Sequence, residues 1–350
     1  MALTAQYDGA GTSGAQSPAP SDFGDVRGEF QALISGCGVY DLSARAKISL
    51  TGGDRVRWLN GMVTNNVRDL APGHGVYAFL LNPQGHILGD LYAYNRGESL
   101  LVDTDRSQME KILAVFDKYI IMDDVEVADV SDNLVALGVA GPGALEVLRA
   151  AGFDLPGLAP LQFAELSWEQ IKLTVVRGDI HLERVECFEL WIAPENAVRV
   201  NDALVKASAV PVGSSAVELL RIAAGIPRYG VDIRERDLPQ ETEQERALSF
   251  VKGCYVGQEI VERIRSRGQV RRKFTGFEID GSLPAPGSKV QVDGKDVGEI
   301  TSVASLPFEA GDCPVALGYI RREVATPDRI VNAGGSEARI KNLPLAEVSK

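Results

Sequence analysis

The sequence of 350 residues lacks any apolar run long enough to cross a membrane as a helix. No stretch approaches the ~18 uninterrupted apolar residues that such a span requires. The beginning of the chain has no basic start and no apolar block, so it resembles neither a secretory signal nor an Arg-rich transit peptide. We therefore expect no membrane partner, and we interpret residues 1–30, rich in Ala, Gly, Ser, Pro and acid, as a disordered lead-in.

Cysteine and histidine are scarce, with four and three residues respectively. Their spacing fits no metal site, and the cysteines are too few for a disulfide framework. We therefore predict no metal ligands and a reducing, cytoplasmic location. The chain also has no Walker loop, dinucleotide fingerprint, nucleophile elbow or zinc-protease motif. The cysteines are Cys37, Cys187, Cys254 and Cys313.

The formal net charge of −12 argues against a protein that coats nucleic acid. One segment departs from this balance, because seven basic and only two acidic residues lie between Lys252 and Lys273. Such a patch indicates an anionic ligand or partner. An RNA-binding module is one alternative, but only Tyr255 and Phe274 could stack on bases. We predict no stable binding of nucleic acid.

A chain of 350 residues is too long for one ordinary core, so we expect two or three domains. Residues 31–130 mix strands with amphipathic helices, and residues 131–250 repeat that order, so both are expected to be α+β units. Residues 251–270 hold a cysteine motif followed by a helix. Residues 271–350 contain short strands separated by Gly and Pro, which predict a small β-barrel or sandwich.

The most specific chemical signal lies at residues 252–259, which read Lys-Gly-Cys-Tyr-Val-Gly-Gln-Glu. The apolar residues Ile260, Val261 and Ile264 that follow share one face of a predicted helix, so Cys254 is expected at or just before a helix N-terminus. The helix dipole and the charge of Lys252 would both favour a thiolate there. The same pattern is compatible with a small packing cysteine between two turn glycines.

Two carboxylates lie in predicted strands beside aromatic residues. By the alternation of side chains, Asp90 shares a face with Tyr92, and Glu189 shares a face with Trp191. A carboxylate in such a place can accept two hydrogen bonds from an amino-pyrimidine ring. Each is also compatible with an outward-facing acid in solvent.

Several segments together resemble the folate-binding YgfZ family, which is related to the aminomethyltransferase of the glycine cleavage system. The resemblance runs from about residue 40 to about residue 320, and the cysteine motif is its most specific part. The matching segments are residues 59–66 (Leu-Asn-Gly-Met-Val-Thr-Asn-Asn), 140–143 (Ala-Gly-Pro-Gly), 188–190 (Phe-Glu-Leu), 221–230 (Arg-Ile-Ala-Ala-Gly-Ile-Pro-Arg-Tyr-Gly), 238–241 (Leu-Pro-Gln-Glu) and 252–259.

The resemblance implies an α+β, aminomethyltransferase-like folate-binding fold. Two ferredoxin-like α+β units and a C-terminal β-barrel would form a three-domain ring around tetrahydrofolate or a one-carbon derivative of it. Members of the family support the assembly or repair of iron–sulfur proteins and, through these, tRNA modification. The implied partners are therefore folate and iron–sulfur client or assembly proteins.

The resemblance also implies roles for individual residues. Glu189 would bind the pterin, and Asn65 and Asp90 would line the pocket. For the arginines of the basic patch we weigh two interpretations, that they hold the barrel to the folate domain or that they meet the glutamate tail of folate, and we prefer the tail. The residues expected at the reactive mouth of the pocket are Cys254 and Lys252, and the further candidates for cofactor binding are Tyr77, Arg228 and Tyr255.

One departure from the aminomethyltransferases concerns the hairpin that the turn residues Asn82-Pro83-Gln84-Gly85, between two strand-like runs, predict. Those enzymes resemble one another in an Asp-Asp pair, where this chain has Gly89-Asp90. One carboxylate remains to hold a ligand, but the apparatus for aminomethyl transfer is incomplete. An aminomethyltransferase of the glycine cleavage type therefore remains the alternative, with an accessory role for iron–sulfur proteins preferred.

Overall fold

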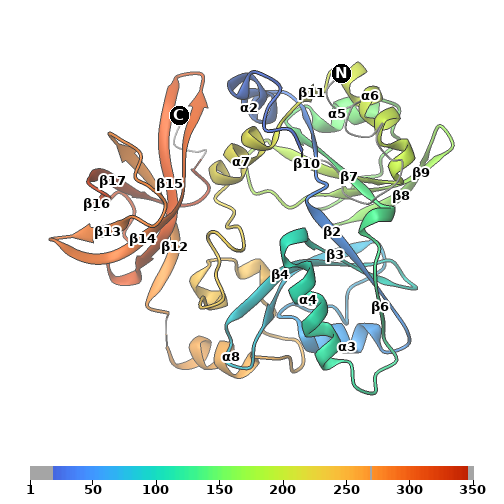
Figure 1. Cartoon of the computed structure of the whole chain (residues 1–350), viewed down its shortest axis with the longest axis horizontal. Helices are drawn as coiled ribbons and strands as arrows, with labels where there is room; N and C mark the ends of the chain where they lie inside the picture. The colour runs from blue at the N-terminus through green and yellow to red at the C-terminus, as the bar shows by residue number, and fades with distance from the viewer. Residues whose placement is uncertain (1–18, 269, 346–350) are drawn as a thin grey trace. The chain divides into compact units, whose positions relative to one another are not determined.

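The computed structural model describes residues 19–268 and 270–345 (Figure 1). The chain divides into two compact units. The first comprises Met1–Asn60, Asn66–Tyr77 and Leu91–Val217, and the second comprises Gly61–Asn65, Ala78–Asp90 and Glu218–Lys350. Among the helices in the described part of the chain, none combines the length and hydropathy that crossing a membrane requires.

The first unit contains a six-stranded sheet. Its strands are β1 (Gly38–Asp41), β7 (Val135–Gly141), β8 (Phe163–Trp168), β9 (Ile171–Arg177), β10 (Glu186–Ile192) and β11 (Val210–Pro211). They lie in the order β11-β1-β7-β10-β9-β8, and only β1 and β11 run parallel. Strand β10 is therefore flanked on both sides, which fixes the direction of each of its side chains.

Helices α5 (Ala144–Ala150) and α6 (Ala197–Lys206) pack against one face of this sheet. Leu148 from α5 and Leu204 from α6 are fully buried against Leu190 of β10. The opposite face of the sheet carries a separate cluster, in which Trp191 and Val176 are buried with Tyr94 and Leu101. This second cluster joins the sheet to strands β4 (Ile87–Asn95) and β5 (Leu100–Asp105).

A second sheet has the strand order β3-β4-β5-β2-β6. Its strands are β2 (Arg45–Thr51), β3 (His74–Leu81), β4 (Ile87–Asn95), β5 (Leu100–Asp105) and β6 (Glu126–Asp129). The hairpin β3–β4 begins and ends in the first unit, and its tip, Ala78–Asp90, belongs to the second. Its turn, Asn82-Pro83-Gln84-Gly85, lies where the sequence predicted it, and Gly85 has a φ of +77°.

Helices α2 (Val26–Ser35), α3 (Arg55–Met62) and α4 (Arg106–Tyr119) accompany these sheets. The start of α2 corrects the predicted lead-in, because Asp25 caps the helix by accepting from Gly28 N and Phe30 is fully buried. Residues 1–18 of that lead-in lie outside the described residues.

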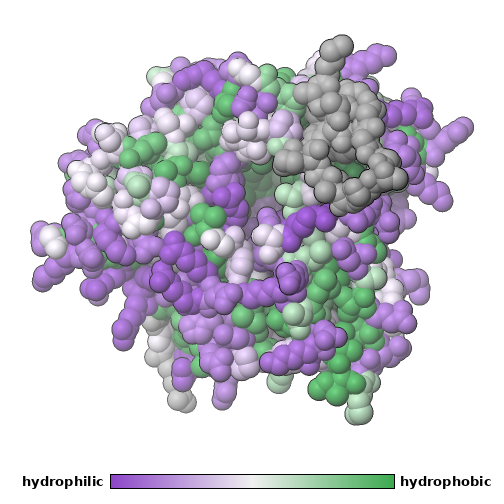
Figure 2. Space-filling view, viewed as in Figure 1, coloured by the Kyte–Doolittle hydropathy of each residue, from purple (hydrophilic) through white to green (hydrophobic). Residues whose placement is uncertain are grey.

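On the face shown in Figure 2, hydrophilic residues predominate, and a hydrophobic patch lies near the end of α4, where Ile121 and Met122 are exposed.

The C-terminal part of the second unit is a closed barrel, so the barrel alternative was correct. Its strands are β12 (Arg272–Asp280), β13 (Lys289–Val292), β14 (Lys295–Phe308), β15 (Gly311–Arg321), β16 (Ile330–Ala333) and β17 (Ser336–Lys341), which close in the order β12-β15-β14-β13-β16-β17. Phe277, Ile300, Ile320 and Ile340 fill its interior. Closure leaves no exposed sheet edge.

A buried carboxylate ties the barrel to the segment before it. Asp232 is fully buried and accepts hydrogen bonds from the hydroxyls of Thr301 and Ser302 on β14. Arg221, near the end of helix α7 (Ser214–Ala223), lies 2.8 Å from the same carboxylate.

Helix α8 (Gln258–Arg267) then precedes the barrel. The short 3₁₀ helices are η1 (Ser131–Asn133), η2 (Pro194–Asn196), η3 (Pro239–Glu241), η4 (Glu245–Ala247) and η5 (Arg322–Val324).

Candidate functional site

Glu189 lies in the middle of the six-stranded sheet of the first unit. It is opposite Gly138 on β7, and Gly138 is opposite Tyr40 on β1, so the three share one face. A Cβ at Gly138 would lie 2.2 Å from Cε2 of Tyr40, so the tyrosine ring occupies the space that a side chain there would need. The glycine thus leaves room for the ring of Tyr40 on the face of the sheet that carries Glu189.

The carboxylate of Glu189 is half-buried and oriented by one neighbour. Trp191 Nε1 donates to Glu189 Oε2 at 2.9 Å, and no other described group donates a hydrogen bond to this carboxylate. Oxygen Oε1 is therefore available to a donor from a ligand. Burial raises the pKa of Tyr40 well above its usual value, and the charges of Cys187 and Glu189 add to that shift, so the hydroxyl stays protonated at neutral pH.

A row of aromatic rings connects Glu189 to the predicted residue Tyr77 within the first unit. The ring centroids of Tyr77 and Tyr92 are 4.9 Å apart, and those of Tyr94 and Trp191 are 5.0 Å apart at 83°, an edge-to-face contact. Tyr92 and Tyr94 are neighbours on one face of β4, at 6.4 Å. These contacts restrict the rotamers of Trp191, and so fix the indole N–H on Glu189.

Behind Trp191 lies a buried ion-pair cluster that the sequence reasoning missed. The Nζ atom of Lys47 and Nε of Arg45 each lie 2.9 Å from Asp103 Oδ1, and both Lys47 and Asp103 have side chains that are only 1% exposed. The lysine ammonium also lies 4.6 Å from the centroid of a Trp191 ring. Lys47 thus connects the buried charges to the residue that orients Glu189.

Burial by itself would raise the pKa of Asp103, but the adjacent charges of Arg45 and Lys47 outweigh it and hold that pKa below its usual value. The carboxylate is therefore ionised at neutral pH. Neither Lys47 Nζ nor Asp103 Oδ2 has a well-aligned hydrogen bond to a described group, so the contact between the side chains is chiefly an ion pair. In the sequence, Lys47 indicates this cluster, because it is a basic residue within the largely apolar segment 46–50.

In the second unit, Lys252 fastens a loop that contains Asn65. Its Nζ atom lies 2.6 Å from the carbonyl oxygen of Val63 and 2.7 Å from that of Asn65, and the side chain is 8% exposed. The amide of Asn65 donates to the carbonyl of Arg246 at 2.8 Å, and the hydroxyl of Thr64 donates to that of Ala247. The structure therefore brings the predicted residues Lys252 and Asn65 together, with the ammonium engaged by backbone oxygens.

Cys254 is exposed, and the chain around it is held on both sides. Lys252 anchors the segment before it, and Val256 N donates to Gly61 O at 3.1 Å after it. Gly257 has a φ of +82°, and a Cβ there would lie 2.6 Å from Asn82 O, so only glycine fits. Helix α8 begins at Gln258, four residues after the thiol, so Cys254 lies in a fixed loop rather than in the first turn.

The other predicted residues are distributed over the two units. Asp90, on β4, belongs to the second unit. Arg228 is half-exposed and pairs with Glu218 at 3.2 Å. Tyr255 is buried against Lys252, whose Nζ lies 5.0 Å from the ring centroid, and burial raises its pKa to about 12. The hydroxyl of Tyr255 is buried and has no described hydrogen-bond partner. The first unit holds Glu189 and Tyr77, and the second holds the remaining candidates.

The Lys252→Met variant is expected to lower the free energy of unfolding by about 1.5–3 kcal/mol, because two backbone carbonyls lose a charged donor. Chemical denaturation measures this loss, and amide hydrogen exchange should show faster opening of residues 61–65. The half-exposed Lys289, which pairs with Glu299, provides the control as Lys289→Met. Equal stability of the two variants would contradict the fastening role of Lys252.

Comparisons with known proteins show the family of this chain. Residues 2–252 match the family described as the GCVT N-terminal domain. The aminomethyltransferase of Rubrobacter xylanophilus is 30% identical over 330 residues, which cover 93% of this chain and 85% of the relative. That of Geobacillus kaustophilus is also 30% identical, over 92% of this chain and 89% of the relative. The chain therefore belongs to the GCVT, or aminomethyltransferase, family.

A solved structure extends the likeness to the whole chain. The glycine cleavage system aminomethyltransferase T from Bartonella henselae superposes with a TM-score of 0.84 at 23% identity, covering 99% of this chain and 98% of that one. This likeness confirms the predicted aminomethyltransferase-like fold. A putative chloroplastic transferase of Arabidopsis thaliana is 28% identical over 87% of this chain and 69% of its own length.

Proposed function

We propose that this chain binds tetrahydrofolate, or a one-carbon derivative of it, and supports iron–sulfur proteins in the manner of the YgfZ family. The single observation that carries folate binding is Glu189, a half-buried carboxylate whose Oε1 accepts no described hydrogen bond. Its setting among aromatic residues fits the flat, donor-rich edge of a pterin. The residues present therefore fit the group that the family implies.

Each residue around Glu189 has a distinct task in this proposal. Glu189 accepts N–H groups of the pyrimidine ring, and a charged acceptor gives short, strong hydrogen bonds. Trp191 holds one carboxylate oxygen in place, and Lys47 lies against the indole. When bound, tetrahydrofolate carries a one-carbon unit. The protein contributes binding and orientation, and Tyr40 and Trp191 limit the access of water to the carboxylate.

Titration of the purified protein with tetrahydrofolate under anaerobic conditions tests the cofactor. Isothermal calorimetry should show saturable binding at one site. An absence of binding by the parent protein would remove the pterin site and, with it, the cofactor part of the proposal.

Cys254 is the residue proposed to act on behalf of iron–sulfur proteins. It is exposed, and its loop is anchored by Lys252 on one side and Val256 on the other. A thiolate in such a place can ligate iron or exchange with another thiol. One cysteine does not complete the ligand set of a cluster, so the client or assembly protein, or a small thiol, supplies the other ligands.

The Cys254→Ala variant is expected to lose its support of cluster enzymes. A deletion strain complemented with this variant should show activity of cluster-containing enzymes close to that of the strain without the gene. The partly buried Cys313 provides the matched control as Cys313→Ala, which should complement like the parent. Full complementation by Cys254→Ala would contradict the proposed role of the thiol. It would not bear on the proposed binding of folate.

The second candidate function is aminomethyl transfer, and the named relatives favour it. It predicts folate-dependent release of ammonia from an aminomethyl-lipoyl carrier protein. Gly89, next to Asp90 on β4, supplies no second acid for this reaction. A turnover assay with the loaded carrier decides between the two, since measurable ammonia release would establish the transferase.

A further inference from the structure

The sheet that contains β2, β4 and β5 brings a guanidinium beside the row of tyrosines in the first unit. Lys47 on β2 and Tyr92 on β4 both lie opposite Asp103 on β5, so the three share one face. Arg45 precedes Lys47 by two residues on β2, and alternation places its side chain on the same face. Its guanidinium carbon lies 5.5 Å from the centroid of the Tyr92 ring. Arg45 is therefore held beside the aromatic row that leads to Glu189.

Asp103 engages one nitrogen of this guanidinium and leaves the other two to a ligand. The Nε atom of Arg45 donates to Asp103 Oδ1 at 2.9 Å, whereas neither Nη atom donates to a described residue. The side chain of Arg45 is 24% exposed, and both Nη atoms keep contact with solvent. Lys47 Nζ also lies 2.9 Å from Asp103, so this carboxylate does not depend on the Nη groups for its neutralisation.

Glu189 supplies an acceptor near these donors. Burial by itself would lower the pKa of Arg45, but the charges of Asp103 and then of Glu189 raise it above its usual value. The charge of Glu189 thus acts on the guanidinium, yet Arg45 and Glu189, both among the described residues, form no ion pair with each other. Because Glu189 Oε1 accepts no described hydrogen bond, a ligand can meet this acceptor and the Nη donors together.

Such a combination of groups matches one edge of a pterin. The pyrimidinone ring presents an amino group, a ring N–H and a carbonyl oxygen in succession along that edge. A carboxylate accepts from the two nitrogen groups, and a guanidinium donates to the oxygen beside them. A ring with an amino group in place of the oxygen would instead bring a donor against a donor.

We propose that Arg45 donates from its Nη atoms to the carbonyl oxygen of the pterin ring and thereby selects ligands that carry this oxygen. A site built to donate to a ligand group discriminates against an analogue that lacks the group, because its donors are then left unpaired. This role rests on the proposed binding of tetrahydrofolate. It adds a specificity-determining residue whose effect is separable from that of Glu189, which accepts from the nitrogen groups of either ring.

The test compares tetrahydrofolate with tetrahydroaminopterin, in which an amino group replaces the carbonyl oxygen of the pterin ring. Anaerobic calorimetry gives both dissociation constants for the full-length protein and for its Arg45→Met variant. We expect Arg45→Met to weaken tetrahydrofolate by roughly 10- to 100-fold, because the oxygen loses a charged donor, and to leave tetrahydroaminopterin no weaker. The readout is the ratio of the two dissociation constants, because a general loosening of the site affects both ligands together.

A second variant guards against a loss of structure in the first. Arg45→Met leaves Lys47 against Asp103, so the buried carboxylate keeps a partner. Arg45→Lys also retains the positive charge beside Asp103, but an ammonium lacks the planar fork that reaches an acid and a ligand at once. We expect the ratio of dissociation constants to change in the same direction in both variants.

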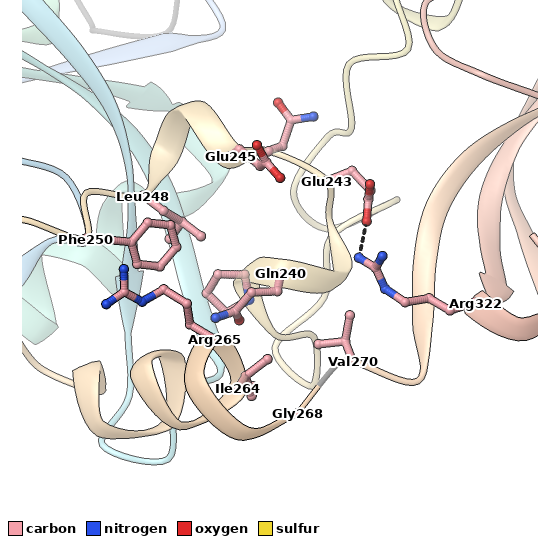
Figure 3. Close-up of a pocket in the computed structure, with 12 residues that line it drawn as sticks. Gln240, Glu243, Glu245, Leu248, Phe250, Ile264, Arg265, Gly268, Val270 and Arg322 are labelled. Atoms are coloured by element: carbon pink, nitrogen blue, oxygen red, sulfur yellow. Dashed lines mark hydrogen bonds and ion pairs between the residues drawn. The ribbon is translucent and has the colours of Figure 1, made fainter.

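Two other arginines provide controls. Arg96, in the first unit, is 27% exposed and pairs with Glu165 at 2.6 Å, so Arg96→Met removes a guanidinium of similar exposure. In the second unit, Arg322 pairs with Glu243 in a pocket of about 190 Å³ beside α8 (Figure 3). Both variants should bind the two ligands like the parent, whereas a ligand bound in that pocket would respond to Arg322→Met.

The outcomes separate this role from the proposed function. If the parent binds tetrahydrofolate and Arg45→Met weakens neither ligand, or weakens both equally, Arg45 does not contact the oxygen. Weaker binding by Arg322→Met would place the ligand in the second unit and would have the same consequence. If the parent binds neither ligand, the proposed folate site is wrong and the role of Arg45 is wrong with it.

Discussion

Replacing Asp103 with asparagine is expected to lower the free energy of unfolding by about 3–5 kcal/mol. The side chains of Asp103 and Lys47 are each only 1% exposed, so water cannot solvate a charge left without its partner. Asparagine keeps the shape of the side chain but removes the negative charge shared by Lys47 and Arg45. The loss is therefore chiefly the cost of burying an uncompensated ammonium rather than of a cavity.

The carboxylate of Asp103 also contributes to the dependence of the unfolding free energy on acidic pH. The pKa of Asp103 is lowered in the folded state, while that in the unfolded chain is about 3.9. The folded state therefore binds the proton less tightly, and the stabilisation is present above about pH 4 and is lost as the pH falls through the folded pKa. Asp103→Asn should show a weaker dependence of unfolding free energy on pH in this acidic range.

Urea denaturation at neutral and acidic pH measures both effects. Asp69, exposed and paired with Arg68 at the surface, gives the control Asp69→Asn, which should leave the midpoint nearly unchanged. Adding Lys47→Met to Asp103→Asn should recover part of the loss, because it removes the buried unpaired charge. If Asp103→Asn alone were as stable as the parent, water or another group would have to neutralise Lys47.

Local sequence patterns were sufficient for much of the fold. The turn Asn82-Pro83-Gln84-Gly85 specified the hairpin β3–β4, because these residue types favour tight turns. The spacing of Ile260, Val261 and Ile264 specified α8, and short strands separated by Gly and Pro specified the barrel. Helix α2 was missed because its signal is one capping aspartate at the end of a polar segment, as Asp25 shows.

The contacts of the site depended on strand register and on residues far apart in the chain. Alternation along one strand was enough to place Glu189 and Trp191 on the same face. Pairing Lys47 with Asp103 requires β2 and β5 to align in one particular register, which no local pattern encodes. Lys252 and Val63 are 189 residues apart, so the fastening of the loop at 61–65 follows only from the tertiary structure.

Glu189→Gln is expected to weaken tetrahydrofolate binding by roughly 10- to 100-fold, if the proposed pterin site is correct. Glutamine still accepts the hydrogen bond from Trp191 Nε1, so the sheet should fold unchanged. It replaces a charged acceptor by a neutral one, however, and its amino group cannot accept an N–H from the pyrimidine edge. The expected loss corresponds to one or two charge-assisted hydrogen bonds.

Glu186 lies on the same strand and provides the matched control. Its side chain points to the opposite face of the sheet and pairs with Arg177 at 2.9 Å, so Glu186→Gln should bind the cofactor like the parent. Anaerobic calorimetry of both variants gives the two affinities under identical conditions. If the parent binds tetrahydrofolate and both variants bind it equally well, the pterin lies elsewhere. Glu189, with its single indole donor, would then be a structural acid of the sheet.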